Sequence, residues 1–333
     1  MPNALSSLRT LAILAGAVAL AGPASAARRP NTASFEYQRS WGLDAIRAQS
    51  AHAAGLSGRG VSIALVDCGV VKARREVMRN VSRRRSVDLN PERKINKPRD
   101  RHGSLVAGPL GAALNGTGML GLAYNATLVS IRADFDGGLD GECAFYPTDL
   151  ARALDYAAEQ QAQVVVLPLQ GRKPLGPAFE AALERLVQSG AVVVIAAGNG
   201  SASQPTWPAR YAVDPRYAGS IVVAGATGWD GMITRWSNKA GLAQAYYIAA
   251  PGEWIITDCV EKCAIVSGTS FATPYVAGAL ALIMEAHPDI TGRQAVQRIL
   301  EAGRDAGDPQ TDPIYGRGIL DLSRAFPAET AGR

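Results

Sequence analysis

The sequence has four polar residues whose side chains could together break an acyl bond. Each follows an apolar run or begins a helical pattern. Asp67 and Asn199 each follow a short apolar run, and His102 and Ser270 each open a helical pattern. In an open parallel sheet, working groups gather where strands end and helices begin. We therefore expect these four side chains to meet at one edge of a sheet.

This set of residue types suits nucleophilic catalysis. A serine hydroxyl is a weak nucleophile, so a histidine must accept its proton, and the histidine needs an anion that fixes its tautomer and stabilises its charged form. Ser270, His102 and Asp67 would fill these three roles. Asn199 and the backbone N–H of Ser270 would donate hydrogen bonds to the oxyanion that forms on the attacked carbonyl.

Each of these residues also has a structural interpretation. An aspartate after a strand is often a turn residue, and serine is common at the start of a helix. Of the three histidines, His52 precedes the first predicted strand, and His287 stands before a proline near a helix end, where histidine is ordinarily a terminal charge. His102 is therefore the candidate base, and the coincidence of four motifs favours catalysis over four separate structural roles.

The elements that must position these side chains alternate between strands and helices. Helical spacing predicts helices over 149–162 and 177–188, with Thr148 as a candidate cap of the first and Gly190 after the second. Such alternation predicts an α/β fold with a mostly parallel central sheet and helices on both faces. Apolar runs predict buried strands over 61–66, 126–131, 163–169, 191–195 and 220–223.

Residues 1–26 have the pattern of a signal peptide, with one charge at Arg9, an apolar run over 11–22 and an Ala-Ser-Ala end. That run is shorter than the roughly 18 residues that a membrane span requires. We therefore expect an exported protein, periplasmic or secreted, with no transmembrane span. The chain is 47% hydrophobic and 19% charged, which is typical of globular proteins. We expect a polar leader over 27–35, one domain over 36–326 and a C-terminal tail over 327–333.

Several short blocks accompany the four candidate residues. The most specific is Gly-Thr-Ser-Phe-Ala-Thr-Pro at 268–274, and the others are Trp-Gly-Leu at 41–43, Gly-Leu-Ala at 121–123, Trp-Pro-Ala at 207–209, Trp-Ser-Asn at 236–238, Ala-Ala-Pro-Gly at 249–252 and Tyr-Gly-Arg-Gly at 315–318. With Asp, His and Ser in that chain order, the sequence resembles the subtilisin-like serine proteases, the subtilase family, from about Trp41 to Leu322. The resemblance implies a three-layer subtilisin-like fold for 36–326 and a serine endopeptidase that cleaves protein or peptide substrates through an acyl-enzyme. No cofactor is required for that chemistry.

The stretch after the strand predicted at 163–169 departs from the family. The family usually has Ser-Leu-Gly there, whose backbone pairs with the substrate and walls the first specificity pocket, whereas this chain has Pro168, Leu169 and Gln170. Proline lacks an N–H, and a side chain at position 170 intrudes where a glycine leaves room. The resemblance implies substrate contacts at these residues and at Gly198. The pocket preference cannot be carried over from the family.

Two further family features depart from the pattern. Most secreted relatives carry a folding and inhibiting prosegment, but here only 14 residues separate Ala26 from Trp41, so we expect unaided folding or a separate chaperone or inhibitor protein. In the family, calcium often stabilises the loop after the histidine helix, which is 114–118 here. This loop offers Asn115 and carbonyl oxygens but no carboxylate, so the sequence gives only weak support for a structural calcium site. No His and Cys cluster has zinc spacing, so we expect no catalytic metal. Separately, we expect a monomer.

The four cysteines allow three pairings in an exported chain. Cys259 and Cys263 lie close together just before the serine block and would form a local clip, which leaves Cys68 to pair with Cys143. The alternative is a free Cys68 beside the candidate acid. Thiol counting on the denatured, unreduced protein separates these alternatives.

The segment from Lys72 to Arg101 has twelve Lys or Arg residues against four acidic residues, a local balance of +8. A segment this basic can meet nucleic acid, an anionic membrane surface or an acidic substrate. Because no aromatic residue interleaves the charges, as a nucleic-acid platform needs, a solvated surface insertion is favoured. The second hypothesis is a subtilisin-fold protein with weak or restricted catalysis that binds a polyanion or a partner through this segment.

Overall fold

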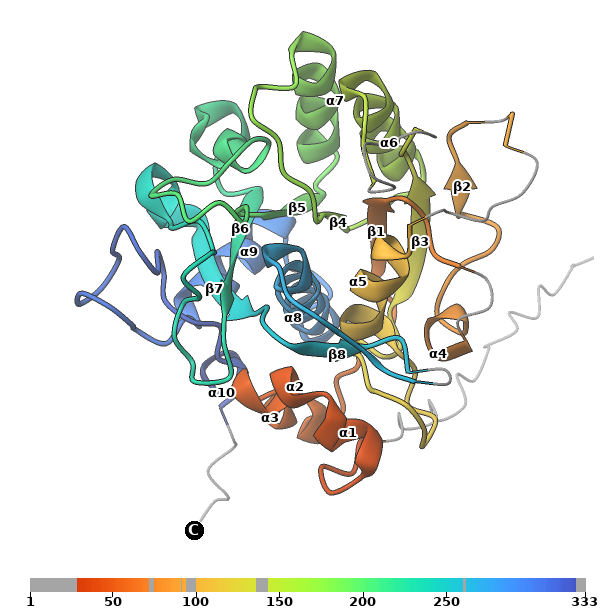
Figure 1. Cartoon of the computed structure of the whole chain (residues 1–333), viewed down its shortest axis with the longest axis vertical. Helices are drawn as coiled ribbons and strands as arrows, with labels where there is room; N and C mark the ends of the chain where they lie inside the picture. The colour runs from red at the N-terminus through yellow and green to blue at the C-terminus, as the bar shows by residue number, and fades with distance from the viewer. Residues whose placement is uncertain are drawn as a thin grey trace, which may run out of the picture.

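Seven parallel strands form the central sheet of the computed structural model, which describes residues 29–71, 75–90, 92–93, 100–135, 143–259 and 262–327. Their order across the sheet is β2-β3-β1-β4-β5-β6-β7 (Figure 1). From β1 the chain goes to the edge strand β2, returns to β3 beside β1, crosses to β4 on the other side of β1, and then runs outward to β7. A crevice is expected at the carboxyl ends of the strands where the winding reverses. The strands are β1 (Ser62–Asp67), β2 (Val87–Asp88), β3 (Thr127–Arg132), β4 (Val164–Leu167), β5 (Val192–Ala196), β6 (Ile221–Thr227) and β7 (Tyr247–Pro251).

The five strands predicted from apolar runs are β1, β3, β4, β5 and β6, and each begins one residue after the predicted start. β4 ends at Leu167 rather than at 169, because Pro168 has no N–H to continue the ladder. β6 runs on to Thr227. The two outermost strands, β2 and β7, were not predicted, and a hairpin of β8 (Ile255–Thr257) and β9 (Ala264–Val266) was also missed.

Helices cover both faces of the sheet, as predicted. In Figure 1, α6 and α7 lie above the sheet, and α5 and α8 lie below it. Alternate residues of β1 point to the two sides: Ile63 and Leu65 join the core on the α5 and α8 side, and Ala64 and Val66 join the core on the α6 and α7 side. The helices are α1 (Phe35–Arg39), α2 (Trp41–Ala45), α3 (Gln49–Ala53), α4 (Arg75–Met78), α5 (His102–Gly111), α6 (Pro147–Glu159), α7 (Pro177–Gln188), α8 (Thr273–Ala286), α9 (Gly292–Glu301) and α10 (Leu322–Ala325).

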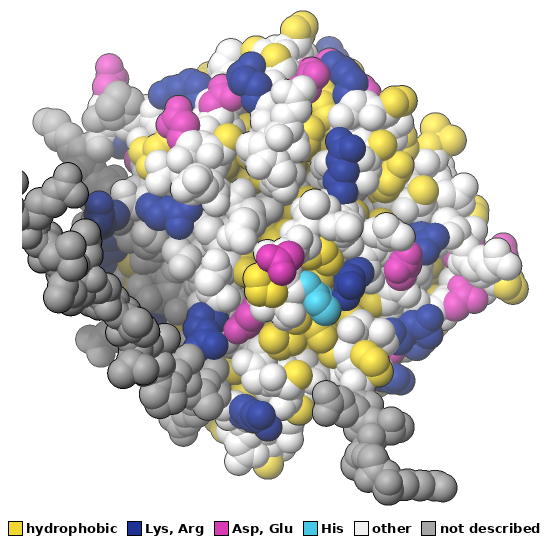
Figure 2. Space-filling view, turned by 180° about the vertical axis from the view of Figure 1, so that it is seen from behind, with side chains coloured by type: hydrophobic (Ala, Val, Ile, Leu, Met, Phe, Trp, Pro, Cys, Tyr) yellow, Lys and Arg dark blue, Asp and Glu magenta, His cyan; other side chains and the backbone are white. Residues whose placement is uncertain are grey.

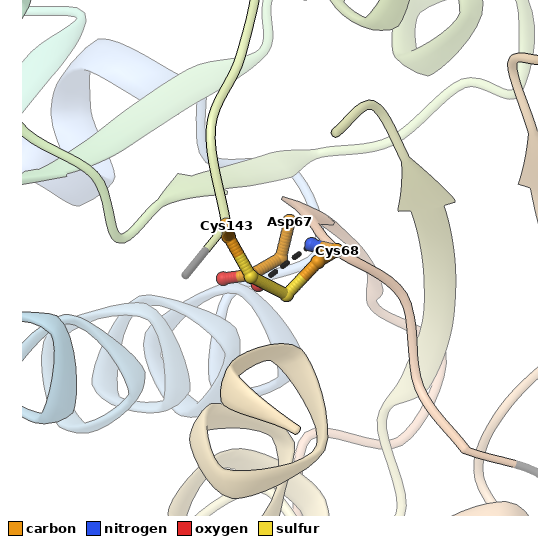
Figure 3. A group of neighbouring side chains, drawn as sticks. All are labelled: Asp67, Cys68 and Cys143. Atoms are coloured by element: carbon orange, nitrogen blue, oxygen red, sulfur yellow. Dashed lines mark hydrogen bonds between the residues drawn. A yellow bond between two sulfur atoms is a disulfide. The ribbon is translucent and has the colours of Figure 1, made fainter. Parts of the chain in front are cut away.

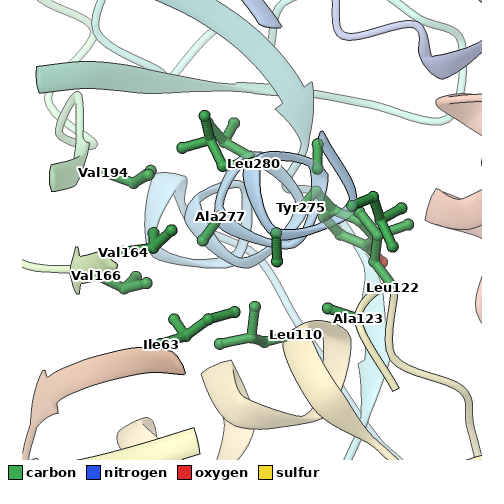
Figure 4. Close-up of a cluster of buried hydrophobic side chains, with 14 of the residues drawn as sticks. Ile63, Leu110, Leu122, Ala123, Val164, Val166, Val194, Tyr275, Ala277 and Leu280 are labelled. Atoms are coloured by element: carbon green, nitrogen blue, oxygen red, sulfur yellow. The ribbon is translucent and has the colours of Figure 1, made fainter. Parts of the chain in front are cut away.

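α8 is the central helix of the larger core. Its residues from Thr273 to Met284 are all buried, as expected for a helix that is apolar on every side. Figure 4 shows Ala277 and Leu280 of this helix facing Val164 and Val194 of the sheet. This packing fixes the start of α8, and therefore the segment just before it, relative to the carboxyl ends of the strands.

Two helix starts differ from the prediction. α6 begins at Pro147, so Thr148 lies inside the helix and Tyr146 is its N-cap. Ser270 lies in a short 3-10 turn, Thr269–Phe271, that precedes α8 rather than opening it. The predicted signal peptide lies outside the described residues, as does the tail beyond 327. Within the described ranges, no helix is both long and apolar enough to cross a membrane.

Candidate active site

A carboxylate and an imidazole meet where β1 ends. Asp67 is the last residue of β1 and is 1% exposed, and His102 is the first residue of α5. Oδ2 of Asp67 lies 2.8 Å from Nδ1 of His102. Because the carboxylate accepts a hydrogen bond from Nδ1 of the neutral ring, the other nitrogen, Nε2, is the basic one.

Small residues let α5 approach β1 closely. A Cβ atom on Gly103 would lie 2.5 Å from the carbonyl oxygen of Gly69 and 3.1 Å from Oδ1 of Asp67. The carboxylate of Asp100 accepts a hydrogen bond of 2.8 Å from the N–H of His102 and so satisfies one donor of the helix start. Asp100 was missed from the sequence, although an aspartate just before a helix is a cap signal.

A disulfide fixes the turn that follows Asp67. Cys68 is bonded to Cys143, with their Cα atoms 5.9 Å apart, and Cys259 is bonded to Cys263. Both predicted pairings are confirmed, and the alternative of a free Cys68 is wrong. Figure 3 shows the carboxylate of Asp67 beside this disulfide, where its Oδ1 accepts a hydrogen bond of 2.7 Å from the N–H of Cys68. Because both sulfur atoms are in the disulfide, this acidic and sulfur-rich cluster offers no thiolate to a metal ion.

Ser270 and His102 line one cleft of about 610 Å³. Ser270 is part-buried, and its hydroxyl donates a hydrogen bond of 2.8 Å to the carbonyl oxygen of Pro168. The 3-10 turn that carries Ser270 is thus attached to the end of β4 as well as to α8. The structure brings the predicted acid, base and nucleophile to one place, with a hydrogen bond between the acid and the base.

The fourth predicted residue, Asn199, also lines this cleft. Its Oδ1 accepts hydrogen bonds from the N–H and the hydroxyl of Thr269, each at 2.8 Å. Because a backbone N–H can only donate, these bonds identify the amide oxygen and leave Nδ2 as a donor. Thr269 therefore positions the amide of Asn199 beside Ser270. Thr269 was missed from the sequence, where its place next to Ser270 was the available signal.

One wall of the cleft continues directly from β4. The predicted substrate-contacting residues of this wall line the cleft: Pro168, Leu169 and Gln170. The next residue, Gly171, exchanges two backbone hydrogen bonds with Trp207, at 2.6 and 3.2 Å. Gly198 is buried, and a Cβ atom on it would lie 3.1 Å from Oε1 of Gln170. Gly198 is not among the residues that line the cleft, so its contact with substrate stays a prediction.

A second segment that lines the cleft comprises residues 143–145. Cys143, Ala144 and Phe145 line the cleft. The N–H of Phe135 donates a hydrogen bond of 3.0 Å to the carbonyl oxygen of Ala144, and the ring of Phe135 stacks on Tyr146 with ring centroids 4.3 Å apart. Both this segment and residues 168–170 therefore contribute to the surface of the cleft.

The loop at 114–118 does not fit a calcium ion. Calcium needs several oxygen ligands pointing to one place. Here the N–H groups of Asn115 and Gly116 point at Oε2 of Glu36, at 3.2 and 2.8 Å, and the side-chain oxygen of Asn115 accepts hydrogen bonds from Thr117. A Cβ atom on Gly118 would collide with Oε1 of Glu76, so a carboxylate fills the other side of the loop.

The basic segment from Lys72 to Arg101 uses part of its charge inside the molecule. Residues 72–74, 91 and 94–99 lie outside the described ranges. Three of its described arginines have internal partners: Arg85 donates to the carbonyl oxygen of Gln160, Arg93 pairs with Asp134, and Arg101 pairs with Asp258. On the face shown in Figure 2, Lys and Arg side chains lie among Asp and Glu side chains. The polyanion-binding hypothesis stays a prediction.

The sheet, its flanking helices and this cleft define a three-layer α/β protein with a candidate Ser, His and Asp site at the carboxyl ends of its strands. The model of the subtilase family, Peptidase_S8, matches residues 58–318. The chain belongs to this family, as the sequence resemblance predicted. Its family and relatives support a serine endopeptidase.

Individual relatives agree with this assignment. Subtilisin BL of Lederbergia lenta is 29% identical over 289 residues, which cover 86% of this chain and 97% of that protein. Subtilisin E of Bacillus subtilis (strain 168) is 28% identical over 299 residues, which cover 87% of this chain and 72% of that protein. A solved protease of Pseudoalteromonas arctica PAMC 21717 superposes with a TM-score of 0.72 at 23% identity, covering 88% of this chain and 98% of that one, and it supports the fold alone.

Proposed function

We propose that the protein is an exported serine endopeptidase that hydrolyses peptide bonds through an acyl-enzyme, with Asp67, His102 and Ser270 as its triad. The observation that carries this proposal is the 2.8 Å hydrogen bond between Asp67 and Nδ1 of His102, in a cleft that Ser270 and Asn199 also line. The two disulfides are consistent with export, because disulfides persist in oxidising compartments.

In the acylation step, the hydroxyl of Ser270 turns from the carbonyl oxygen of Pro168 to His102 and attacks the peptide carbonyl carbon. Its proton passes to Nε2 of His102, and Asp67 stabilises the imidazolium. The carbon–nitrogen bond then breaks as His102 gives the proton to the leaving amine. Water repeats the sequence on the ester and releases the acid product and free Ser270.

Charge on the attacked oxygen needs donors that are already in place. Nδ2 of Asn199 and the N–H of Ser270 would supply them. The two hydrogen bonds from Thr269 to Oδ1 of Asn199 fix the amide, so little reorganisation is needed when the charge forms.

Labelling with a fluorophosphonate tests the activated serine directly, because the probe reacts with a serine that has a base beside it. We expect the mature protein to be labelled on Ser270, and Ser270→Ala to stay unlabelled. Ser267→Ala is the matched control, because Ser267 lines the same cleft and its hydroxyl accepts a hydrogen bond from the N–H of Trp254. Labelling that persists in Ser270→Ala, or is lost in Ser267→Ala alone, contradicts the assignment.

Hydrolysis of casein or a fluorogenic peptide then ranks the catalytic groups. In subtilisin, which belongs to this same family, removing the serine costs about a million-fold in kcat, and removing the oxyanion donor costs about 10²–10³-fold. We expect losses of the same order for Ser270→Ala and Asn199→Ala. Two variants with wild-type rates would exclude the mechanism.

A further inference from the structure

The side chain of Gln170 connects the segment that follows β4 to the segment that follows β5, and both segments line the cleft. Gln170 belongs to the wall that follows β4, and its Oε1 accepts a hydrogen bond of 2.8 Å from the backbone N–H of Asn199, which follows β5. The two backbone hydrogen bonds between Gly171 and Trp207 hold the adjoining residue of the wall. The side chain of Gln170 is therefore held at its tip by the hydrogen bond to Asn199, and the backbone beside it is held by the hydrogen bonds of Gly171.

This bridge lies where the substrate must place a side chain. During attack, the substrate carbonyl lies between the hydroxyl of Ser270 and Nδ2 of Asn199. The side chain on the acyl side of that carbonyl starts one carbon away, between the wall of Gln170 and the segment that carries Asn199. Successive side chains of an extended peptide alternate in direction, so this acyl-side residue is the one that meets Gln170.

Side-chain atoms also crowd the position next to Gly198. Around the position of a Cβ atom on Gly198, polar atoms of three side chains converge: Nδ2 of Asn238 at 2.5 Å, Oγ1 of Thr206 at 2.7 Å and Oε1 of Gln170 at 3.1 Å. Gly198 has a φ of +107°, a conformation that side chains rarely adopt. A long substrate side chain entering here would have to displace the side chain of Gln170 and break its hydrogen bond to the N–H of Asn199.

On the basis of the proposed function, we propose that Gln170 determines specificity by closing the acyl-side pocket, and that the protein cleaves after small uncharged residues such as Gly, Ala and Ser. The side chain of Gln170, held by its hydrogen bond to the N–H of Asn199, narrows this pocket from the wall. Substrates with a large aromatic or aliphatic residue before the scissile bond are excluded by volume.

Two fluorogenic peptides test this proposal. They are identical except for Ala or Phe before a single coumarin amide bond, so the bond that breaks is fixed. With rates normalised by fluorophosphonate titration of active sites, we expect the wild type to favour Ala over Phe at least about tenfold in kcat/KM, because one methylene group in a pocket already changes discrimination by about 10–200-fold. Gln170→Gly should raise the Phe-to-Ala ratio at least about tenfold.

Two further variants separate a specificity role from a structural one. Gln170→Glu keeps the shape of the side chain and an oxygen that can accept from the N–H of Asn199, so it should retain the wild-type ranking. Gln188→Ala, on the exposed face of α7, should leave the ratio unchanged. Equal rates on both peptides in the wild type, an unchanged ratio in Gln170→Gly, or labelling without cleavage of the Ala peptide would overturn the inference alone. Absence of both labelling and cleavage would overturn the proposed function and this inference with it.

Discussion

Two carboxylates are buried at opposite ends of α5, and they have different partners. Asp67, 1% exposed, faces the imidazole of His102 at the first residue of the helix. Glu76, 6% exposed, accepts hydrogen bonds from the N–H groups of Met119, at 3.1 Å, and Cys259, at 2.9 Å. Its own carbonyl oxygen accepts from the N–H of Ala113, just after the helix.

The partner, rather than burial, distinguishes the roles of these two acids. An imidazole can gain and lose a proton at neutral pH, so a carboxylate beside it can support proton transfer. A backbone N–H group only donates a hydrogen bond and takes up no proton at neutral pH, so Glu76 has no partner for proton transfer. Its carboxylate instead joins the loop around Gly118 to the β8–β9 hairpin. Burial raises the pKa of the Glu76 carboxyl, and the hydrogen bonds from Cys259 and Met119 partly oppose that rise.

The largest effect is expected for Asp67→Asn. An asparagine can turn its NH₂ group toward His102, which makes Nδ1 the acceptor and puts the proton on the wrong nitrogen. We expect kcat/KM to fall by about 10⁴-fold, the cost known for such an exchange in a Ser-His-Asp triad. The melting temperature, measured in a Ser270→Ala background that prevents self-digestion, should change by a few degrees at most. A variant that unfolds as it loses activity would give Asp67 a structural role.

Glu76→Ala should show the opposite pattern. It leaves the N–H groups of Met119 and Cys259 without partners, and an unsatisfied buried group costs about 1–3 kcal/mol. We expect the free energy of unfolding to fall by about that amount, and kcat/KM per active site to stay within about twofold of the wild type because Glu76 has no contact with the cleft. Glu159→Ala, at the exposed end of α6, is the control. A large loss of kcat/KM in the folded variant would end the distinction between the two acids.

The pH dependence of stability sharpens the same comparison. Because the folded pKa of Glu76 is raised above its ordinary value of about 4.5, the folded state binds more protons than the unfolded state between these two values. The stabilisation that comes from protonation of Glu76 is therefore complete below about pH 4.5 and is lost as the pH rises through the folded pKa. Urea midpoints of the wild type and Glu76→Gln, both with Ser270→Ala, should diverge across this window. Parallel curves would contradict the assignment.

The smallest effect is expected from metal chelation. In the loop at 114–118, the N–H groups of Asn115 and Gly116 face the carboxylate of Glu36, and the side chain of Asn115 is hydrogen-bonded within the loop. We expect neither calcium nor a chelator to shift the melting temperature, whereas an ion at 100 times its Kd would add about 2.7 kcal/mol. A calcium-dependent rise that disappears in Asn115→Ala would show that this loop does bind the ion.

The five strands β1, β3, β4, β5 and β6 and the candidate triad could be predicted from local sequence, because they depend on short apolar runs and on polar residues at the ends of strands or starts of helices. β1 and β5 were predicted to within a residue for this reason. The roles of Glu76 and Asp100 were not predicted from the sequence. The carboxylate of Glu76 meets N–H groups 43 and 183 residues away, so no local pattern carries its role. The segment from Cys143 to Phe145 has no apolar run, and its place depends on the disulfide and on pairing with Phe135.

The bond between Cys68 and Cys143 also changes what a cut in the chain would do. It closes a ring whose ends are 75 residues apart in sequence and which contains His102. A single break anywhere inside that ring leaves one covalently connected molecule, with acid and base still tethered to the same body. For an enzyme surrounded by copies of itself, a nick there need not separate the parts of its active site.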